Sequence, residues 1–360
     1  NMKNYPLWKI FVVFILLSLG IIFAIPSLLY KEDTGSWYLD NRLNLGLDLQ
    51  GGSYLLLEVQ TDVLIKEEFE NFSDTVRIIS RENRVKINNI DKQNDVLKVR
   101  FDSSEKLNTI REEFLKNYRS VTFSITNNIA SISIDDIYKK SIQDGAIKQS
   151  LEIVRKRIDE SGTKEPLIQR SGRDRILLQL PGVKDPERIK DLLGKTAKLN
   201  FHMVDDDDTK SLSLNIAPFG RMIVSDISNE EIKYLLEKKS RVGGENLIDA
   251  YASFDPTEGH AVSFRFDTTG AQKFGKATSE NIGKRFAVVL DGVVITAPVI
   301  NSAITGGSGI ITGNFTSQEA TDLAVLLRAG ALPAPLEIVE ERSVGPGLGA
   351  DSIAAGKIAS

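Results

Sequence analysis

The longest apolar run of the chain lies near its N-terminus, where 21 residues from Ile10 to Tyr30 carry no charge. A helix of this length would extend about 31 Å, close to the hydrocarbon thickness of a bilayer. Lys3 and Lys9 precede the run, so the positive-inside rule predicts a cytoplasmic N-terminus and an outside location for the rest. A cleaved signal peptide is the alternative, but its apolar region spans about 7–15 residues and ends in a small-x-small site. We therefore expect a retained transmembrane helix over residues 10–30.

Further along the chain, the apolar patterns predict three segments built from strands and a capped helix. Asp185 before Pro186 is typical of a helix N-cap, Thr316 and Glu319 form a predicted capping box, and Gly330 ends that helix. Short strands in βαβ-like units are typical of an α+β fold of the ferredoxin type. The predicted elements are 96–101, 103–118 and 121–125; 175–180, 185–193 and 197–203; and 316–328 and 336–341.

A longer helix is predicted over residues 138–161, where apolar residues recur at helical spacing and Gly162 follows. The apolar stripe is expected to face a core. The basic residues of this helix, Arg157 among them, are expected on its solvated face.

The pattern changes between residues 205 and 313. A helical segment is predicted near 230–239 and a strand over 261–266, and Asp291-Gly292 between two β-branched runs predicts a hairpin over 286–299. We interpret this region as a second α+β subdomain inserted into the first. Its two connections, the candidate hinge, are expected at Val204, Asp205, Gly313 and Thr316.

Glycines interrupt a strand-like pattern directly after the apolar run, at Gly46, Gly51 and Gly52. Their spacing is within one residue of the phosphate-binding pattern G-x-x-x-x-G-K-[ST], but Gly52 occupies the lysine position and Asp48 would repel a phosphate. We therefore interpret the segment, with Gln50, as the joint between the membrane helix and the strand predicted over 54–60, where glycine lets the chain turn.

A second glycine-rich segment lies near the end of the chain. Gly345 and Gly347 match the weak nucleotide-binding spacing G-x-G-x-x-[GA], but Pro346 stiffens the loop and no acidic ribose partner follows. We interpret it as a flexible joint after the last strand. The segment expected to return the chain to the membrane, close to the first glycine joint, comprises Gly330, Pro333, Pro335, Gly345, Pro346 and Gly347.

Composition narrows the possible chemistry. The chain has 360 residues, a formal net charge of −4, two histidines and no cysteine, which excludes disulfides, thiolate metal sites and cysteine nucleophiles. No basic tract with interleaved aromatic residues occurs, so a nucleic-acid partner is not expected. Neither H-E-x-x-H nor G-x-S-x-G occurs, so we expect no enzyme, no metal site and no cofactor.

The remaining polar candidates have ordinary structural explanations. The four acids at 205–208 lack the spaced ligands of a calcium loop and are expected in a solvated loop. His202 is expected on the polar face of its strand with Lys198 and Asn200, and His260 at a boundary between loop and strand.

Four segments of the chain together resemble the SecD family of bacterial protein-translocation accessory subunits. They are spread over the span 45–353, whereas 62–135 matches less clearly and resembles an extra module of longer members. Gln50 stands where the family often has a basic residue. The four segments are LGLDLQGG at 45–52, EPLIQRSGRDRILLQLPGVKDPERIKDLLGKTAKLNF at 165–201, NIGKRFAVVLDGVVITAPVINSAITGG at 281–307 and LAVLLRAGALPAPLEIVEERSVGPGLGADSI at 323–353.

The resemblance implies a transporter of the resistance-nodulation-division type in the bacterial inner membrane, with SecF, the SecYEG channel and unfolded secretory polypeptide as partners. It implies that proton-gradient-driven motion of a periplasmic head against a base helps to draw polypeptide outward. The proton-carrying acid of the family lies in a later membrane helix, so the chain is expected to be truncated after its first periplasmic domain.

The resemblance and the patterns together predict a division of the chain into eight parts. They are a cytoplasmic N-terminus (1–9), a transmembrane helix (10–30), a first part of the periplasmic base (31–61), an extra α+β module (62–135), a second part of the base (136–204), an inserted head (205–315), a base return (316–344) and an approach to a second membrane helix (345–360). Two other functions stay open at this point, a passive membrane-anchored scaffold or binding module and an anchored hydrolase.

Overall fold

The computed structural model describes residues 7–28, 51–93, 95–163, 165–183 and 185–344. It divides into two units, one of Asn1–Gly51 with Val344–Ser360 and one of Gly52–Ser343. The helix of the first unit is α1 (Leu7–Leu28), with exposed apolar side chains such as Phe11 and Phe14. Within the described ranges, no helix combines the length and the hydropathy needed to cross a membrane.

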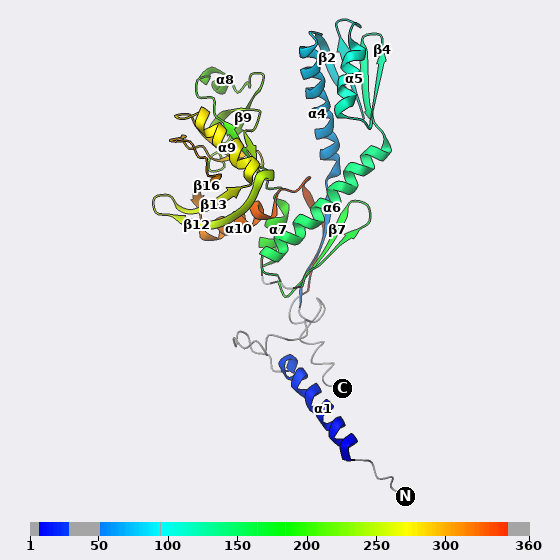
Figure 1. Cartoon of the computed structure of the whole chain (residues 1–360), viewed down its shortest axis with the longest axis vertical. Helices are drawn as coiled ribbons and strands as arrows, with labels where there is room; N and C mark the ends of the chain where they lie inside the picture. Colours follow the sequence, from blue (N-terminus) through cyan, green and yellow to red (C-terminus); the bar gives the residue numbers. More distant parts are fainter. Residues whose placement is uncertain (1–6, 29–50, 94, 164, 184, 345–360) are drawn as a thin grey trace. The chain divides into compact units, whose positions relative to one another are not determined.

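The second unit begins and ends in one four-stranded sheet, which we call the base sheet. With its helices it comprises β1 (Gly52–Val59), α6 (Asp136–Glu160), β6 (Leu167–Ser171), β7 (Arg175–Pro181), α7 (Pro186–Gly194) and β17 (Leu336–Val344). The strand order is β17-β1-β7-β6, and β7 is antiparallel to both of its neighbours. Helix α6 lies on this sheet with α7 beside it (Figure 1). Alternate residues of β1 and β7 are buried, as expected for a sheet with one covered face.

An extra module is inserted between β1 and α6. It comprises α4 (Thr61–Glu82), β2 (Ile87–Gln93), β3 (Val96–Phe101), α5 (Leu107–Asn117), β4 (Val121–Thr126) and β5 (Ile129–Ile134). Its sheet has the order β2-β3-β5-β4. The module has its own hydrophobic core, in which Phe72 packs edge-on against Phe114 with ring centroids 5.5 Å apart.

The remaining elements form the head, built on two larger sheets and a hairpin. They are β8 (Leu199–Met203), α8 (Thr209–Leu214), β9 (Arg221–Ser225), β10 (Lys233–Glu237), β11 (Val242–Gly243), β12 (Leu247–Asp255), β13 (Gly259–Phe266), α9 (Thr268–Glu280), β14 (Phe286–Leu290), β15 (Val293–Thr296), β16 (Ser308–Phe315) and α10 (Ser317–Ala329). The sheets have the orders β11-β8-β14-β15, β12-β13-β16 and β10-β9. Helix α10 packs on β12 and β13 and also touches α6 of the base.

One hydrophobic core runs from the base into the head. It includes Leu57 of β1, Leu178 of β7, Leu326 of α10 and Phe264 of β13. The head contributes a group of packed aromatic rings around Phe201. The base and the head therefore share buried surface, whereas the extra module has a separate core.

Most predicted elements are present, and two details differ. The hairpin of β14 and β15 turns at Asp291-Gly292, and α10 begins with the capping box of Thr316 and Glu319, as predicted. The prediction of a helical segment near 230–239 is wrong, because Lys233–Glu237 forms strand β10 and pairs with β9. Leu236 of β10 packs against one face of the head sheet. The strands on either side of α7, expected in one βαβ-like unit, lie in different sheets, since β7 belongs to the base and β8 to the head.

The expected position of the returning chain also needs correction. The carbonyl of Pro335 accepts a hydrogen bond from the Gln60 amide at 2.9 Å, so Pro335 lies beside the end of β1. Gly52 is at the beginning of that strand, about 26 Å away for eight residues of extended chain. The later part of β17 is near the glycine joint instead, where the Arg342 guanidinium lies over the Tyr54 ring.

Candidate functional site

The glycine joint requires backbone that other residues rarely adopt. Gly51 has φ 71° and Gly52 has φ 138°, and both angles are in the region that favours glycine. Gly52 already pairs with Pro181 of β7, so the turn is completed as the sheet begins. The other predicted joint residues, Gly46, Asp48 and Gln50, lie outside the described residues, as do Gly345, Pro346 and Gly347.

The contacts between base and head centre on Arg157, which is near the end of α6 and fully buried. Its Nη1 donates to the carbonyls of Leu192 at 2.6 Å and Lys195 at 2.5 Å. Its Nη2 donates to the carbonyls of Thr196 at 3.1 Å and Gly330 at 3.2 Å. The prediction of a solvated side chain is therefore wrong, because four carbonyls replace water around a group with several donors in a fixed fork. Burial lowers the pKa of Arg157 to about 10, so it is cationic at neutral pH.

Asp291 holds the same stretch of chain from the head. It occupies the turn between β14 and β15 with φ 49°, and its carboxylate accepts from the Thr196 hydroxyl at 2.5 Å and the Ala197 and Lys198 amides at 2.9 and 2.7 Å. The Asp291 amide donates back to the Lys198 carbonyl at 3.1 Å. The turn that the sequence predicts as a simple hairpin therefore also fixes the connection from α7 to β8.

The two connections between base and head touch each other at this point. The Leu332 amide donates to the Thr196 carbonyl at 2.8 Å, so the outgoing connection, 195–198, contacts the returning one, 330–332. We call Arg157, Asp291 and these two segments the crossover junction. Gly330 is the C-cap of α10 with φ 91°, and Pro333 follows in the returning segment.

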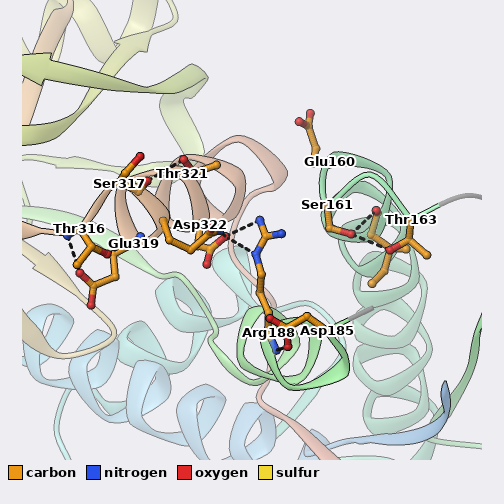
Figure 2. Close-up of polar contacts among 12 residues, drawn as sticks. Glu160, Ser161, Thr163, Asp185, Arg188, Thr316, Ser317, Glu319, Thr321 and Asp322 are labelled. Atoms are coloured by element: carbon orange, nitrogen blue, oxygen red, sulfur yellow. Dashed lines mark hydrogen bonds and ion pairs between the residues drawn. The ribbon is translucent and has the colours of Figure 1, made fainter. Parts of the chain in front are cut away.

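Helix α10 is also tied to both base helices, and Figure 2 shows its contact with α7. Arg188 projects from α7 toward Asp322 of α10 and donates to one carboxylate oxygen from Nε at 3.0 Å and from Nη2 at 2.8 Å. Arg328 of α10 pairs with Glu160 of α6 at 2.5 Å and donates to the Ala250 carbonyl in β12 at 3.0 Å. Two partly exposed ion pairs, Arg188–Asp322 and Arg328–Glu160, thus hold α10 to the base beside the buried crossover junction.

The four predicted hinge residues lie in two other places. Val204 and Asp205 follow β8, where their amides donate to the carbonyls of Arg285 and Leu235. Gly313 lies in a bulge of β16, where a Cβ would meet the Phe315 ring at 2.9 Å, and Thr316 caps α10. Both pairs lie within the head as the sheets define it, and the crossings between the sheets are at the crossover junction.

The polar residues singled out by the sequence are engaged structurally. Asp205 pairs with Arg221, Asp206 with Arg285, and Asp208 caps α8, so three of the four acids have specific partners. Within the described part of the chain, no group of three or more histidine and acidic side chains could hold a metal ion.

The polar face of β8 on which His202 is expected is not open to solvent, because the β9–β10 hairpin covers it. The His202 side chain is 5% exposed, and its Nδ1 is 2.8 Å from the Glu237 carbonyl. Burial keeps the pKa of His202 below its ordinary value.

The head also presents a shallow groove of ≈580 Å³ on the open face of its three-stranded sheet. Tyr251 of β12, Ser263 of β13 and Ile310 of β16 are register partners across the sheet and line this groove. The Tyr251 and Ile310 side chains are each 54% exposed. The groove can therefore offer apolar contacts beside the β12 edge of the sheet.

Sequence reasoning missed the role of Arg157, although a signal for it exists. Ala146 and Ser150 precede it by eleven and seven residues and lie on the same side of α6, and all three are buried. Because Ala146 and Ser150 are small, neighbouring elements can pack closely against this side of α6, and the buried surface of the helix then includes Arg157.

Three family models match separate parts of the chain. The SecD/SecF GG motif matches residues 40–63, the N-terminal P1 domain of protein translocase subunit SecDF matches 147–206, and the SecDF P1 head subdomain matches 221–334. The first of these contains the glycine joint, and the last contains α10.

Individual relatives are similar along nearly the whole chain. Protein translocase subunit SecD of Rickettsia conorii is 42% identical over 359 residues, which are 99% of this chain and 69% of the relative. SecD of Magnetococcus marinus is 38% identical over 368 residues, with the same two coverages of 99% and 69%. A crystal structure of SecDF in a super-membrane-facing form aligns with a TM-score of 0.52 and 27% identity, covering 99% of this chain and 37% of that one. The chain therefore belongs to the SecD family of protein translocase subunits.

Proposed function

We propose that this chain serves Sec-dependent protein export by binding emerging unfolded polypeptide and promoting its outward movement through motion of the head against the base. The observation that carries the proposal is the crossover junction, where two short connections meet around Arg157. A few residues at the ends of elements are the usual hinges of domain motion. The predicted hinge residues Val204, Asp205, Gly313 and Thr316 would add bending within the head.

We further propose that residues 10–30 anchor the chain in the bacterial inner membrane, with a cytoplasmic N-terminus and a periplasmic second unit. The uncharged run, the preceding lysines and the exposed apolar side chains of α1 support this topology. An intramembrane acid is the physical requirement for proton coupling, and residues 10–30 contain none. The coupling to the proton gradient would therefore reside in other membrane helices, and SecF and SecYEG would be the partners.

The base in this proposal is ferredoxin-like. Its strands have the order four-one-three-two when numbered along the chain, and helices follow the first and third of them. This order supports a split βαβ arrangement for the base. The expected boundaries of base, extra module and head are part of the same proposal.

A passive scaffold is the second candidate function, and the shared core of base and head favours it. Buried residues such as Leu178 of the base and Phe264 of the head belong to one cluster, which resists separation. A scaffold needs no relative motion, so restraining the head distinguishes the two functions.

The test is to link base to head in living cells. The chain has no cysteine, so Glu160→Cys with Arg328→Cys provides one reactive pair between α6 and α10. Linking this pair with a short bismaleimide should reduce secretion if the head moves. Unchanged secretion in fully linked cells would refute the motion and support the scaffold.

A matched control links two strands within the extra module. Ser124 and Ser131 are register partners on β4 and β5, so Ser124→Cys with Ser131→Cys places the same linker where no motion is proposed. Secretion should be unaffected by this link. The unlinked double variants control for the substitutions themselves.

A further inference from the structure

The outward face of α4 carries three contacts with the head. Glu67 pairs with Lys198 at 3.7 Å, and Asp74 pairs with Lys238 at 3.5 Å. About two turns further along α4, the Arg81 guanidinium lies 4.2 Å from the centroid of the Phe219 ring, a favourable cation–π distance.

These three α4 residues form a straight line along the helix. They are seven residues apart, so each is rotated by only about 20° from the one before, and together they span about 21 Å. The opposite side of α4, with Ile65, Phe69, Phe72, Val76 and Ile79, is buried in the core of the extra module. Asp74 lies about 180° around the helix from Ile65 at 100° per residue. One side of α4 therefore packs in its own module while the other side faces the head.

The head residues that contact α4 extend from the crossover junction to the β9–β10 hairpin. Lys198 belongs to the crossover junction, where Asp291 holds it. Lys238 follows β10 and Phe219 precedes β9, and the Lys238 amide donates to the Gly220 carbonyl at 2.9 Å. The three α4 residues thus contact the head at separate places, from the crossover junction to the β9–β10 hairpin.

The charges on the two surfaces are complementary, because acids face lysines and a guanidinium faces an aromatic ring. The contacts are also exposed, with the Lys238 side chain 64% and the Asp74 side chain 49% accessible. Exposed ion pairs are individually weak and are screened by salt. Such a surface can hold the head in one position and still release it.

We propose that α4 is a docking surface for the head of the same chain, on which the head rests in one position of its motion. The inference deepens the proposed function, because it rests on a head that moves. The stretch 64–146, which contains most of α4, lies between the matched GG motif and the matched P1 domain, and neither match extends to it. The docking surface therefore assigns a role to the extra module.

The test measures the distance between the extra module and the head in the full 360-residue chain in detergent. Spin labels at Thr122→Cys on β4 and Glu258→Cys in the β12–β13 turn are unique because the chain has no cysteine, and both positions are exposed and away from the contact. We expect one dominant distance at low salt. Asp74→Lys should increase the population of longer distances several-fold, and salt of about 1 M, where the Debye length is about 3 Å, should do the same.

Two further variants make the result decisive. Asp74→Lys also removes the pair with Arg77 on α4, at 3.6 Å, so restoration of the original distance by adding Lys238→Asp is the required outcome. Glu112→Lys, an exposed charge reversal on α5, should change nothing. Equal distances with and without Asp74→Lys, or no restoration by Lys238→Asp, would overturn the docking surface. The readout needs no secretion, so its failure is separate from failure of the linking experiment on Glu160 and Arg328.

Discussion

Arg157 and Gly330 are 173 residues apart in sequence, yet the Arg157 guanidinium donates a 3.2 Å hydrogen bond to the Gly330 carbonyl. The same nitrogen donates to the Thr196 carbonyl, so one buried cation holds both connections between base and head. A buried charge is costly unless it is hydrogen-bonded, so these carbonyls stabilise the guanidinium in its buried position. The junction therefore depends on a single side chain in a way that an apolar contact would not.

The first prediction concerns this side chain. Arg157→Met keeps an unbranched apolar side chain but removes the guanidinium donor from the carbonyls of Leu192, Lys195, Thr196 and Gly330, of which Thr196 keeps the Leu332 amide as a second donor. Each buried group left unpaired costs about 1–3 kcal/mol. We expect the free energy of unfolding in urea to fall by about 3 kcal/mol or more. Arg157→Lys should fall between wild type and Arg157→Met, because an ammonium keeps the charge but cannot reproduce the fork.

The neighbouring Lys156 provides the control. It is exposed on the same turn of α6, so Lys156→Met should change stability by no more than about 0.5 kcal/mol. Equal losses in the two variants would mean that the basic face of α6, and not the buried junction, sets the stability.

The junction also shows what the sequence can and cannot predict. Local signals locate the α10 capping box, the α7 N-cap and the Asp291 turn, because each depends on residues within a few positions. The burial of Arg157 depends on carbonyls of residues 192–196 and 330, which no local pattern specifies. The sequence favours a helix where strand β10 forms for a similar reason, since pairing with β9 overrides a weak local preference. The sheet to which each strand belongs is likewise set by tertiary packing.

The glycine joint gives the second prediction. Gly52→Val places a β-branched residue at φ 138°, a backbone conformation that is favourable only for glycine. The strain should lower the free energy of unfolding by about 1–3 kcal/mol. We expect a lower urea midpoint for this variant and for Gly51→Val, with reduced secretion and unchanged membrane insertion.

Gly145 is the matched control for glycine replacement. It lies within α6, and a Cβ added to it would have no other atom within 4 Å, so Gly145→Ala should stabilise the chain by about 0.5–1 kcal/mol. A loss of stability for Gly145→Ala, or none for Gly52→Val, would show that backbone conformation does not govern these positions.

The third prediction concerns the groove of the head. If unfolded polypeptide binds there, Tyr251→Ala and Ile310→Ala should each weaken binding by about 5- to 10-fold, corresponding to about 1–1.4 kcal/mol of lost apolar contact. Fluorescence anisotropy of a labelled unfolded polypeptide measures the change. Ile227→Ala, in the loop between β9 and β10, is the control because the Ile227 side chain is similarly exposed at 51%. Equal affinities for all three variants and wild type would exclude the groove as the binding surface.

The last prediction follows from the burial of His202 beneath the β9–β10 hairpin. Burial holds the pKa of His202 below its ordinary value, so between the folded pKa and about 6.5 the unfolded chain binds more protons than the folded chain. Stability should therefore rise with pH through that window and fall on acidification from about pH 7.5 to about pH 5.5.

His202→Gln can still donate toward the Glu237 carbonyl but cannot titrate, so its stability should vary less over the same range. Urea denaturation of both chains at the two pH values measures the difference. Carboxylates with a lowered pKa, such as Asp206, titrate below this range and do not contribute to it. If wild type and His202→Gln lose the same stability on acidification, His202 is not the group that links the hairpin to pH.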